Sequence, residues 1–547
     1  MAEAEPRGGR MGLVLTASAA GTVFEWYDFF IFGSLLSIIT RHFFAGAGET
    51  QGYIFALLTF AVGFAVRPFG GLVFGYFGDR AGRKRAFLVT ITIMGIATFA
   101  IGLLPDSSQI GSMAPYLLIA LRILQGFAVG GEYGGAAIYV AEHAAADRRG
   151  AATGWIQVAA TVGLFLALSV ILIVRTGLGE DAFGDWAWRI PFLVSLGLLL
   201  ISIWIRLRLD ESPAFRQLLL EGTTSRAPLS EAFLRWRNLR IVIVVLIGLL
   251  MGQGVVWYTA QFYTQFFLER VVKVEAPLVN LLILSVTVLS ALLHIFFARL
   301  SDRVGRKPVM LFGLGLAALT LIPGFQWLTH AVNPALAEAT VRAPVAVLAP
   351  PDECSLQFDL IGKTKFTSSC DIAKSTLTNL GVPYRNEAVD PGTLARIRIG
   401  TTSLSSIDGT VLAPSALAVA QKNFAAEVKK ALRAAGYPAK ADSSRVDVPL
   451  AIAILLIFVI GAAALYGPQA ATLVELFPTR IRYSALSLPY HVGVGWFGGF
   501  LPPAAFAIVA ATGNLYAGLW YPVTIAGIGF VVTLLFLPET RGRDITR

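Results

Sequence analysis

Long apolar runs alternate with short polar segments along most of the chain. The runs are about 20 residues long, which is the length an α-helix needs to cross the ~30 Å hydrocarbon core of a bilayer. Because lipid offers no partner to open backbone groups, each run is expected to be helical. The pattern predicts twelve transmembrane helices, at about 12–38, 52–77, 86–104, 115–140, 152–174, 190–208, 241–267, 278–299, 309–329, 450–473, 484–510 and 519–537.

A charged motif between helices 2 and 3 recurs between helices 8 and 9. The motif is Asp-Arg-x-Gly-Arg-Lys, at 79–84 and again at 302–307. Its recurrence at the same place in each set of six helices predicts two halves built alike, as pseudo-symmetric six-helix bundles. We interpret both copies as conformational-switch loops, with the positions Gly75, Asp79, Arg80, Gly82, Arg83, Lys84, Asp302, Arg303, Gly305, Arg306 and Lys307.

The aspartate of each switch loop is expected to act on a neighbouring helix. Asp79 and Asp302 should pair with arginines and cap helix ends, where the helix dipole favours an anion. Such contacts would hold the two halves together in one conformation and release them in the other. The switch loops are therefore not expected to touch substrate.

The segment between helices 9 and 10 breaks the transmembrane pattern. Residues 331–448 have the polarity of a soluble protein, and the segment is too long for an ordinary connection. Alternation in Ala395-Arg-Ile-Arg-Ile-Gly predicts a strand, and apolar residues one turn apart between Ser415 and Ala435 predict a helix. We therefore expect a small inserted α+β domain.

Both cysteines of the chain, Cys354 and Cys370, lie in this insert. If the insert is exported, they are expected to form one disulfide; the alternative is two unpaired small residues. Two thiols without a nearby histidine make a poor zinc site, so no metal is expected.

The apolar runs and the insert divide the chain into five parts. They are the first six-helix bundle at 1–208, an interdomain loop at 209–240, helices 7–9 at 241–330, the insert at 331–448, and helices 10–12 with a short tail at 449–547. The fold class is an all-α polytopic membrane protein that carries one small α+β domain. The interdomain loop is basic and amphipathic, and we expect part of it to lie on the membrane surface as a tether.

Composition and charge agree with a membrane protein. Only 14% of residues are charged, against roughly 25% in soluble domains. The net charge of +10 comes mainly from arginines and lysines in the loops that follow even-numbered helices and in the tail, which is the positive-inside pattern rather than a nucleic-acid surface. Both termini are therefore expected in the cytoplasm of a bacterial cell, with the chain in the inner membrane and 331–448 outside. The first run holds Glu25 and Asp28, and is interpreted as helix 1 rather than a removable signal.

Ionisable residues inside predicted helices are costly and indicate function. Glu25 and Asp28 share one face of helix 1, helix 2 carries Arg67, and helix 4 carries Arg122 and Glu132. Counting 1.5 Å per residue places Glu25, Arg67 and Glu132 at one level near mid-membrane, with the other two nearer the outer mouth. A carboxylate facing an arginine can alternate between paired and protonated states, as proton coupling requires. The alternative is a permanent ion-pair network that only orients helices.

Further polar residues in the second half are weaker candidates, for substrate binding and, in the case of the two histidines, for substrate or proton binding. They could line a polar cavity, although contacts between helices explain them almost as well. They are Gln253, Tyr258 and Gln261 in helix 7, His294 in helix 8, Tyr466 and Gln469 in helix 10, and His491 in helix 11.

Other function classes find no support in the sequence. The glycine-rich run at 130–135 lacks the Lys-Ser/Thr of a phosphate-binding loop and is expected to bring helices close together. No nucleophile–base constellation stands out. An ATP-driven pump, an enzyme and a bound cofactor are therefore not expected.

Several motifs resemble those of the major facilitator superfamily and, more narrowly, of its metabolite:proton symporters. The broad resemblance rests on the two switch loops and on Arg122-x-Leu-Gln-Gly126. The narrower one rests on Glu25-Trp-Tyr-Asp28-Phe, Gly130-Gly-Glu-Tyr-Gly-Gly135, Glu142-His143, Trp188-Arg-Ile-Pro191, Glu211-Ser-Pro213, Glu475-Leu-Phe-Pro-Thr-Arg480 and Glu539-Thr-Arg-Gly-Arg543. The narrower family includes carriers of α-ketoglutarate, citrate, shikimate, and proline or betaine.

The resemblance implies two bundles around a central cavity, alternating access, and uptake driven by protons. It supports Glu25 and Asp28 as coupling residues and Arg122 as a functional arginine. The insert departs from the family pattern, and its role stays open. The chain also lacks the long C-terminal extension found in an osmosensing proline/betaine branch, which weighs against that assignment.

The sequence thus favours proton-coupled uptake of a small polar metabolite, with a carboxylate such as a dicarboxylate, α-ketoglutarate or a shikimate-like acid preferred. One alternative is a carrier of zwitterionic solutes. Another is a sensor that binds ligand on the exported domain, although no signalling element is visible. The expected partners are substrate, proton and lipid bilayer, with function as a monomer and with a partner of the exported domain left open.

Overall fold

The computed structural model describes residues 7–44, 49–355 and 367–545. Helices of the first half are α1 (Arg7–Ser34), α2 (Leu36–Phe43), α3 (Glu49–Ala81), α4 (Arg83–Leu103), α5 (Ser107–Ile110), α6 (Met113–His143), α7 (Arg149–Leu178), α8 (Glu180–Asp185) and α9 (Ile190–Leu207). A loop with α10 (Pro213–Leu220) and α11 (Pro228–Phe233) leads into the second half.

The second half begins with a helix that contains three π-helical turns. Its parts are α12 (Trp236–Val245), η3 (Leu246–Leu250), α13 (Met251–Tyr258), η4 (Thr259–Tyr263), α14 (Thr264–Phe266) and η5 (Phe267–Val271). The remaining helices are α15 (Ala276–Val304), α16 (Arg306–Val332), α20 (Val448–Leu476), α21 (Arg482–Tyr490), η9 (His491–Gly498), α22 (Leu501–Thr512) and α23 (Trp520–Phe536). π-helical turns are frequent at functional sites.

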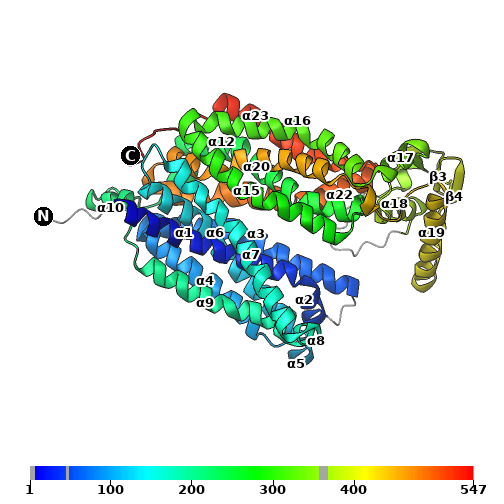
Figure 1. The fold of residues 1–547 in the computed structure, drawn as a ribbon, viewed down its shortest axis with the longest axis horizontal. Helices are drawn as coiled ribbons and strands as arrows, with labels where there is room; N and C mark the ends of the chain where they lie inside the picture. The colour runs from blue at the N-terminus through cyan, green and yellow to red at the C-terminus, as the bar shows by residue number, and fades with distance from the viewer. Residues whose placement is uncertain (1–6, 45–48, 356–366, 546–547) are drawn as a thin grey trace.

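Among the described residues, eleven helices are long and apolar enough to cross a membrane. The pair Val14–Ser34 and Leu36–Phe43, bent by 63°, adds a twelfth if it counts as one span. The helices form two bundles that lie side by side (Figure 1). The expected all-α membrane architecture is therefore confirmed, with eleven or twelve candidate spans among the described residues.

Glycines let α3 and α6 approach closely, as the glycine-rich run at 130–135 predicts. A side chain at Gly126 would overlap the Gly63 backbone, and one at Gly130 would overlap the carbonyl of Arg67. Small residues of this kind permit backbone contact between membrane helices. The close packing brings Arg67 and the α6 backbone together in the middle of the first bundle.

The segment between α16 and α20 contains α17 (Pro334–Arg342), β1 (Val345–Ala349), α18 (Ser369–Asn379), β2 (Arg385–Ala388), β3 (Arg396–Ile399), β4 (Thr402–Ser405) and α19 (Pro414–Ala434). Its sheet has the order β2-β1-β3-β4, and only β1 and β2 are parallel. The strand and helix expected around Arg396 and Phe424 are both present. Cys354 and Cys370 are joined by a disulfide.

This insert docks on the second half. The Tyr384 N–H donates to the Gly513 carbonyl at 2.9 Å, and the Asn386 amide reaches the carbonyls of Ala511 and Thr512 at 3.3 Å. Gly513 has a φ of +73°, which a residue with a side chain adopts only with strain.

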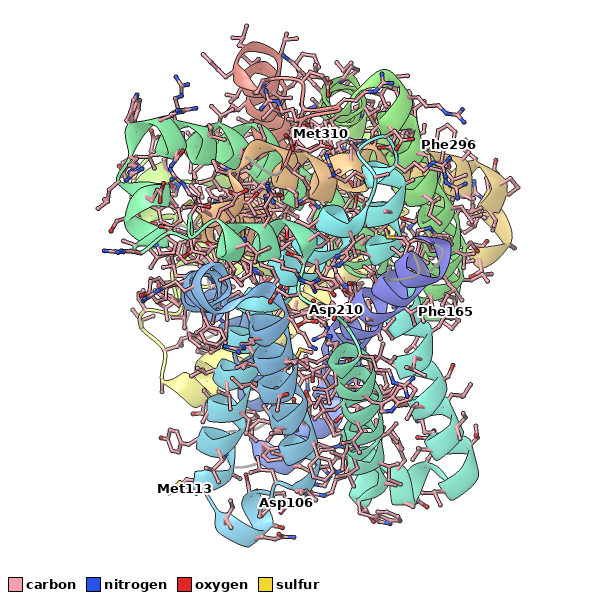
Figure 2. The ribbon with its side chains drawn as sticks, turned by 90° about the vertical axis from the view of Figure 1, so that its left-hand side faces the viewer. Asp106, Met113, Phe165, Asp210, Phe296 and Met310 are labelled. Atoms are coloured by element: carbon pink, nitrogen blue, oxygen red, sulfur yellow. A yellow bond between two sulfur atoms is a disulfide. The ribbon has the colours of Figure 1, made fainter. Side chains whose placement is uncertain are left out.

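The molecule therefore has two distinct ends, which we call the termini face and the insert face. The described chain ends lie near the termini face, and the sheet and α19 project at the insert face (Figure 1). Figure 2 looks onto the termini face, with Asp210 near its centre, Met310 and Phe296 of the second half above, and Met113 of the first half below.

Candidate functional site

A small cavity lies between the two halves. It is lined by Thr22, Glu25, Trp26, Arg67, Tyr133, Gln157, Trp257, Tyr258, Tyr466, Tyr490, His491, Val494 and Gly495. Its volume is about 30 Å³, which is the share of liquid volume that one water molecule takes. The site must therefore widen before it can hold a metabolite.

Aromatic rings from both halves form much of the wall of this central cavity. The rings of Trp26 and Trp257 lie 5.4 Å apart, and Tyr133 stacks on Tyr490 at 3.9 Å. Tyr466 contacts the Tyr490 hydroxyl at 3.0 Å. The Trp26–Trp257 and Tyr133–Tyr490 pairs each join one half to the other, so these rings separate when the halves move apart. Their faces carry the negative quadrupole that attracts cations.

Two opposite charges face the central cavity without pairing. The Arg67 guanidinium lies over the Phe64 ring at 4.3 Å, and its Nε has no hydrogen-bond partner in the part of the chain that the structure describes. Among the described residues, no carboxylate comes within 4 Å of Arg67 and no basic nitrogen within 4 Å of Glu25. Glu25 nevertheless lies within electrostatic range of Arg67, Glu132 and Asp28. Both charges can therefore interact with a ligand between them.

Asp28 lies in a separate polar cluster inside the first bundle. It accepts hydrogen bonds from Gln125 at 2.8 Å, Thr98 at 2.9 Å and Arg122 at 3.5 Å. Arg122 also donates to Gln125 at 2.8 Å. These residues do not line the central cavity. Sequence analysis identified Asp28 and Arg122 as candidates but did not identify Thr98. It included Gln125 in a family motif without assigning it a role.

Glu132 has a partner that sequence analysis missed. It pairs with Arg206 of α9 and accepts a hydrogen bond from Thr90 at 3.0 Å. A side chain at Gly21 of α1 would overlap this ion pair. Arg206 lies at the end of a span, where an arginine is normally attributed to the positive-inside pattern. Glu132 is therefore paired with Arg206, and within the described residues it forms no ion pair with Arg67.

The remaining polar candidates divide into two groups. Tyr258, Tyr466 and His491 line the central cavity, whereas Gln253, Gln261, His294 and Gln469 do not. Gln261 accepts a hydrogen bond from Thr287 at 3.3 Å, and His294 Nδ1 lies 2.6 Å from the Ser290 carbonyl. Gln253 and Gln469 are fully buried, and no hydrogen bond to their amides is formed within the described ranges.

A second cluster of charged residues lies at the termini face, where the two switch loops contact the opposite halves. Asp79 forms an ion pair with Arg83 at 2.6 Å. It also accepts from the backbone N–H groups of Tyr483 at 3.1 Å and Ser484 at 2.8 Å, at the N-terminus of α21 in the other half. Both contacts expected of Asp79 are therefore present.

The second switch loop makes the reciprocal contacts. Asp302 forms an ion pair with Arg306 at 2.6 Å. It accepts from the backbone N–H groups of Gly150 at 2.8 Å and Ala151 at 2.7 Å, at the N-terminus of α7. Each aspartate therefore reaches from its own half to a helix N-terminus of the other half. We call the contacts of the two switch loops the latch.

Two further ion pairs cross between the halves beside the latch. Arg482 pairs with Glu142 at 2.5 Å, and Arg149 pairs with Glu475 at 3.0 Å. Glu475 also contacts Arg306 at 3.2 Å. Glu142 and Glu475 occur in family motifs, but their partners could not be assigned from sequence.

A glutamate outside the spans completes each copy of the latch. Glu211 accepts from the N–H groups of Arg83 and Lys84 at 3.1 and 3.3 Å, and Glu539 accepts from those of Arg306 and Lys307 at 2.9 and 3.1 Å. Burial raises the pKa of Glu211. Burial acts on Glu539 in the same direction, but four backbone N–H donors outweigh it and hold the pKa below 4.5.

The other switch-loop residues have local roles. Gly82 and Gly305 both have a φ of +109°, which explains the glycine in each motif. The amines of Lys84 and Lys307 bond to the carbonyls of Leu207 and Leu534 at 3.0 and 2.8 Å. A side chain at Gly75 would come within 2.8 Å of Ser484, whereas Arg80 and Arg303 are exposed.

Comparison with known proteins agrees with this architecture. The family model described as "Sugar (and other) transporter" matches residues 13–230 and 432–547. The chain is 29% identical to the glycine betaine/proline/ectoine/pipecolic acid transporter OusA of Dickeya dadantii (strain 3937), over 98% of this chain and 85% of that protein.

Two further relatives come from Escherichia coli (strain K12). Identity to its proline/betaine transporter is 36%, over 58% of this chain and 65% of that protein. Identity to its shikimate transporter is 39%, over 56% and 70%. A solved structure of the proton:xylose symporter XylE superposes with a TM-score of 0.63 at 15% identity, covering 99% of this chain and 98% of that one. At that identity the likeness shows the fold alone.

The fold is that of the major facilitator superfamily, and the protein is a multi-pass membrane transporter. Within that class, the chain belongs to the sugar (and other) transporter family.

Proposed function

We propose that the protein is a proton-coupled symporter for a small zwitterionic solute, one that joins an ammonium group to a carboxylate. The observation that carries this proposal is the central cavity, in which unpaired Arg67 and Glu25 face a site walled by aromatic rings. The sequence favoured a carboxylate. A cavity with both signs of charge and aromatic faces suits a zwitterion better.

The two ends of such a substrate have complementary partners. Arg67 binds the carboxylate, since its planar guanidinium matches a carboxylate in two hydrogen bonds. Trp26, Trp257 and Tyr466 hold the ammonium end against their ring faces. The relatives named as glycine betaine, proline and ectoine transporters support this class of solute.

Proton coupling is proposed to use Glu25. Substrate carboxylate bound at Arg67 brings a second negative charge next to Glu25, which favours protonation of Glu25. Release of substrate restores the attraction of Arg67 and expels the proton. Asp28, held by Arg122 and Gln125, is proposed as a second proton-binding group between this site and the insert face.

The latch is proposed to control alternating access. Formation of the latch closes the termini face, and its rupture opens the central cavity to that side. We place the termini face in the cytoplasm of a bacterial cell, from the positive-inside pattern. The insert face is then outside the inner membrane, where a disulfide persists. The protein is proposed to work as a monomer, with the chain divided at 208, 240, 330 and 448.

A shikimate-like acid is the second candidate substrate. The 39% identity to the shikimate transporter favours it, and Arg67 could bind its carboxylate. Such an acid would leave the aromatic faces without a cation.

The decisive experiment is a counterflow screen in proteoliposomes under an imposed pH gradient. Glycine betaine, proline, shikimate and α-ketoglutarate are compared as substrates. We expect zwitterions to be exchanged, and uptake to be abolished by a protonophore and by Glu25→Gln. Exchange of shikimate or α-ketoglutarate alone contradicts the zwitterion assignment, and uptake indifferent to protonophore contradicts symport.

The insert is tested by deleting residues 335–446. Unchanged uptake would exclude a role in gating or in substrate capture, and leave a partner-binding role.

A further inference from the structure

A large basic cavity lies at the termini face, apart from the central cavity. Its volume is about 800 Å³, within the usual range of ligand sites. Three segments form its walls, namely the interdomain loop with the start of α12, the chain around η8 (Thr479–Ile481), and the C-terminal tail. Four arginines line it, which are Arg235, Arg237, Arg480 and Arg543. We call this cavity the basic pocket.

The charges of the basic pocket are only partly compensated. Glu231 pairs with both Arg235 and Arg480. Arg237 and Arg543 are exposed and, within the part of the chain that the structure describes, have no carboxylate within 4 Å. Glu221 and Asp544 also line the pocket. Two guanidinium groups thus remain available for an anion, beside the positive end of α12.

Apolar side chains surround the polar lining. Leu220 is 84% exposed and precedes the lining residue Glu221, while Leu234 and Trp236 are 81% and 69% exposed and flank Arg235. Large apolar residues this exposed next to arginines are typical of segments that lie at a membrane surface. Tryptophan in particular prefers the headgroup level. The basic pocket therefore opens where phospholipid phosphates lie.

We propose that the basic pocket binds a phosphate-bearing anion, and that its source is an anionic phospholipid headgroup in the adjacent leaflet. Arg237 and Arg543 hold the phosphate, and the apolar rim receives the start of the acyl chains. Arg237 lies in the first turn of α12, where the interdomain loop ends, and Arg543 lies in the C-terminal tail. A bound phosphate therefore ties the end of the loop to the tail, beside the latch. A soluble phosphate offers the same chemistry without the acyl chains.

The test measures binding to the full-length protein in neutral detergent. The thermal unfolding midpoint is titrated with phosphatidylglycerol, with phosphatidylcholine, and with inorganic phosphate. We expect phosphatidylglycerol to raise the midpoint at concentrations where phosphatidylcholine does not. The double variant Arg237→Gln/Arg543→Gln should weaken the apparent affinity about fivefold for each arginine, or roughly thirtyfold together.

Two matched variants separate a site from a general charge effect. Arg226→Gln removes an exposed arginine of the same loop outside the pocket, and should leave the affinity unchanged. Arg237→Lys/Arg543→Lys keeps the charge and should retain most of the binding, which shows that the double glutamine variant lost a ligand and not its fold.

If inorganic phosphate raises the unfolding midpoint of the wild type but not of the double glutamine variant, the phosphate site is supported and its ligand is assigned to a soluble source. Equal responses to both lipids with no response to phosphate overturn the proposal. So does an equal loss in Arg226→Gln. None of these readouts depends on transport, so their outcome is independent of the proposed substrate.

Discussion

The two copies of the latch share their geometry but differ in how their charges are connected. At the first copy, the latch pair Asp79–Arg83 is separate from the neighbouring ion pair Glu142–Arg482. In the second copy, Glu475 contacts both Arg149 and Arg306, so four side chains including Asp302 form one network. Arg83 instead donates to the carbonyls of Gly78 and Thr479.

This difference predicts how much stability is lost when one member of a buried ion pair is removed. An isolated buried pair leaves an uncompensated charge when one member is removed, at a cost of about 3–5 kcal/mol. In a network the remaining member keeps a second partner, and the cost is smaller. The second copy should therefore tolerate loss of its aspartate, but not loss of its shared glutamate.

The largest effect is expected for Glu475→Gln. This change leaves two buried arginines, Arg149 and Arg306, without their shared carboxylate, whereas Glu142→Gln leaves only Arg482. We expect Glu475→Gln to reduce the free energy of unfolding by more than about 4 kcal/mol, and Glu142→Gln by about 3 kcal/mol. Thermal or denaturant unfolding in detergent measures both, and equal losses would contradict the network.

Asp79→Asn should cost more than Asp302→Asn. Arg83 then has no ion-pair partner within 4 Å among the described residues, whereas Arg306 keeps Glu475. We expect losses of about 3 kcal/mol and about 1 kcal/mol. Distances between spin labels on the two halves at the termini face would lengthen more in Asp79→Asn. A larger loss in Asp302→Asn than in Asp79→Asn would show that Asp302 contributes more to the stability of the latch.

The capping glutamates should respond to pH in opposite directions. The pKa of Glu539 is lowered, so the stability it contributes is present above 4.5 and is lost as pH falls through the lowered pKa. The pKa of Glu211 is raised, so its contribution is largest below 4.5 and declines as pH rises through the raised pKa.

At pH 7, Glu539→Gln should therefore cost about 1 kcal/mol and Glu211→Gln less. Unfolding midpoints measured from pH 4 to pH 8 test this. The comparison fails if Glu211→Gln is the more destabilising change at pH 7.

The smallest effects are expected for the exposed arginines of the switch loops. Arg80→Gln and Arg303→Gln should each change the free energy of unfolding by less than about 0.5 kcal/mol, because exposed charges are screened by solvent. A loss above about 1 kcal/mol in either variant would show that the latch extends to the surface.

Local patterns in the sequence determined the spans, the two halves and the latch motif. A transmembrane run is set by its own length and composition. Asp79 and Arg83 are only four residues apart, across the turn at Gly82, and Asp302 and Arg306 are four residues apart across the turn at Gly305. The strand at Arg396 and the helix at Phe424 follow from alternation and helical period in the same way.

Only the tertiary structure decided which residues meet across the chain. The contacts of Arg206 with Glu132, of Glu475 with its two arginines, and of Asp302 with the start of α7 join residues 74 to 326 positions apart. The same holds for the central cavity, which takes Glu25 and excludes Asp28 although both lie on one face of α1. Spacing along a helix predicts which residues share a face. Which residues that face contacts depends on the packing between helices, because the partners lie on segments far away in the sequence.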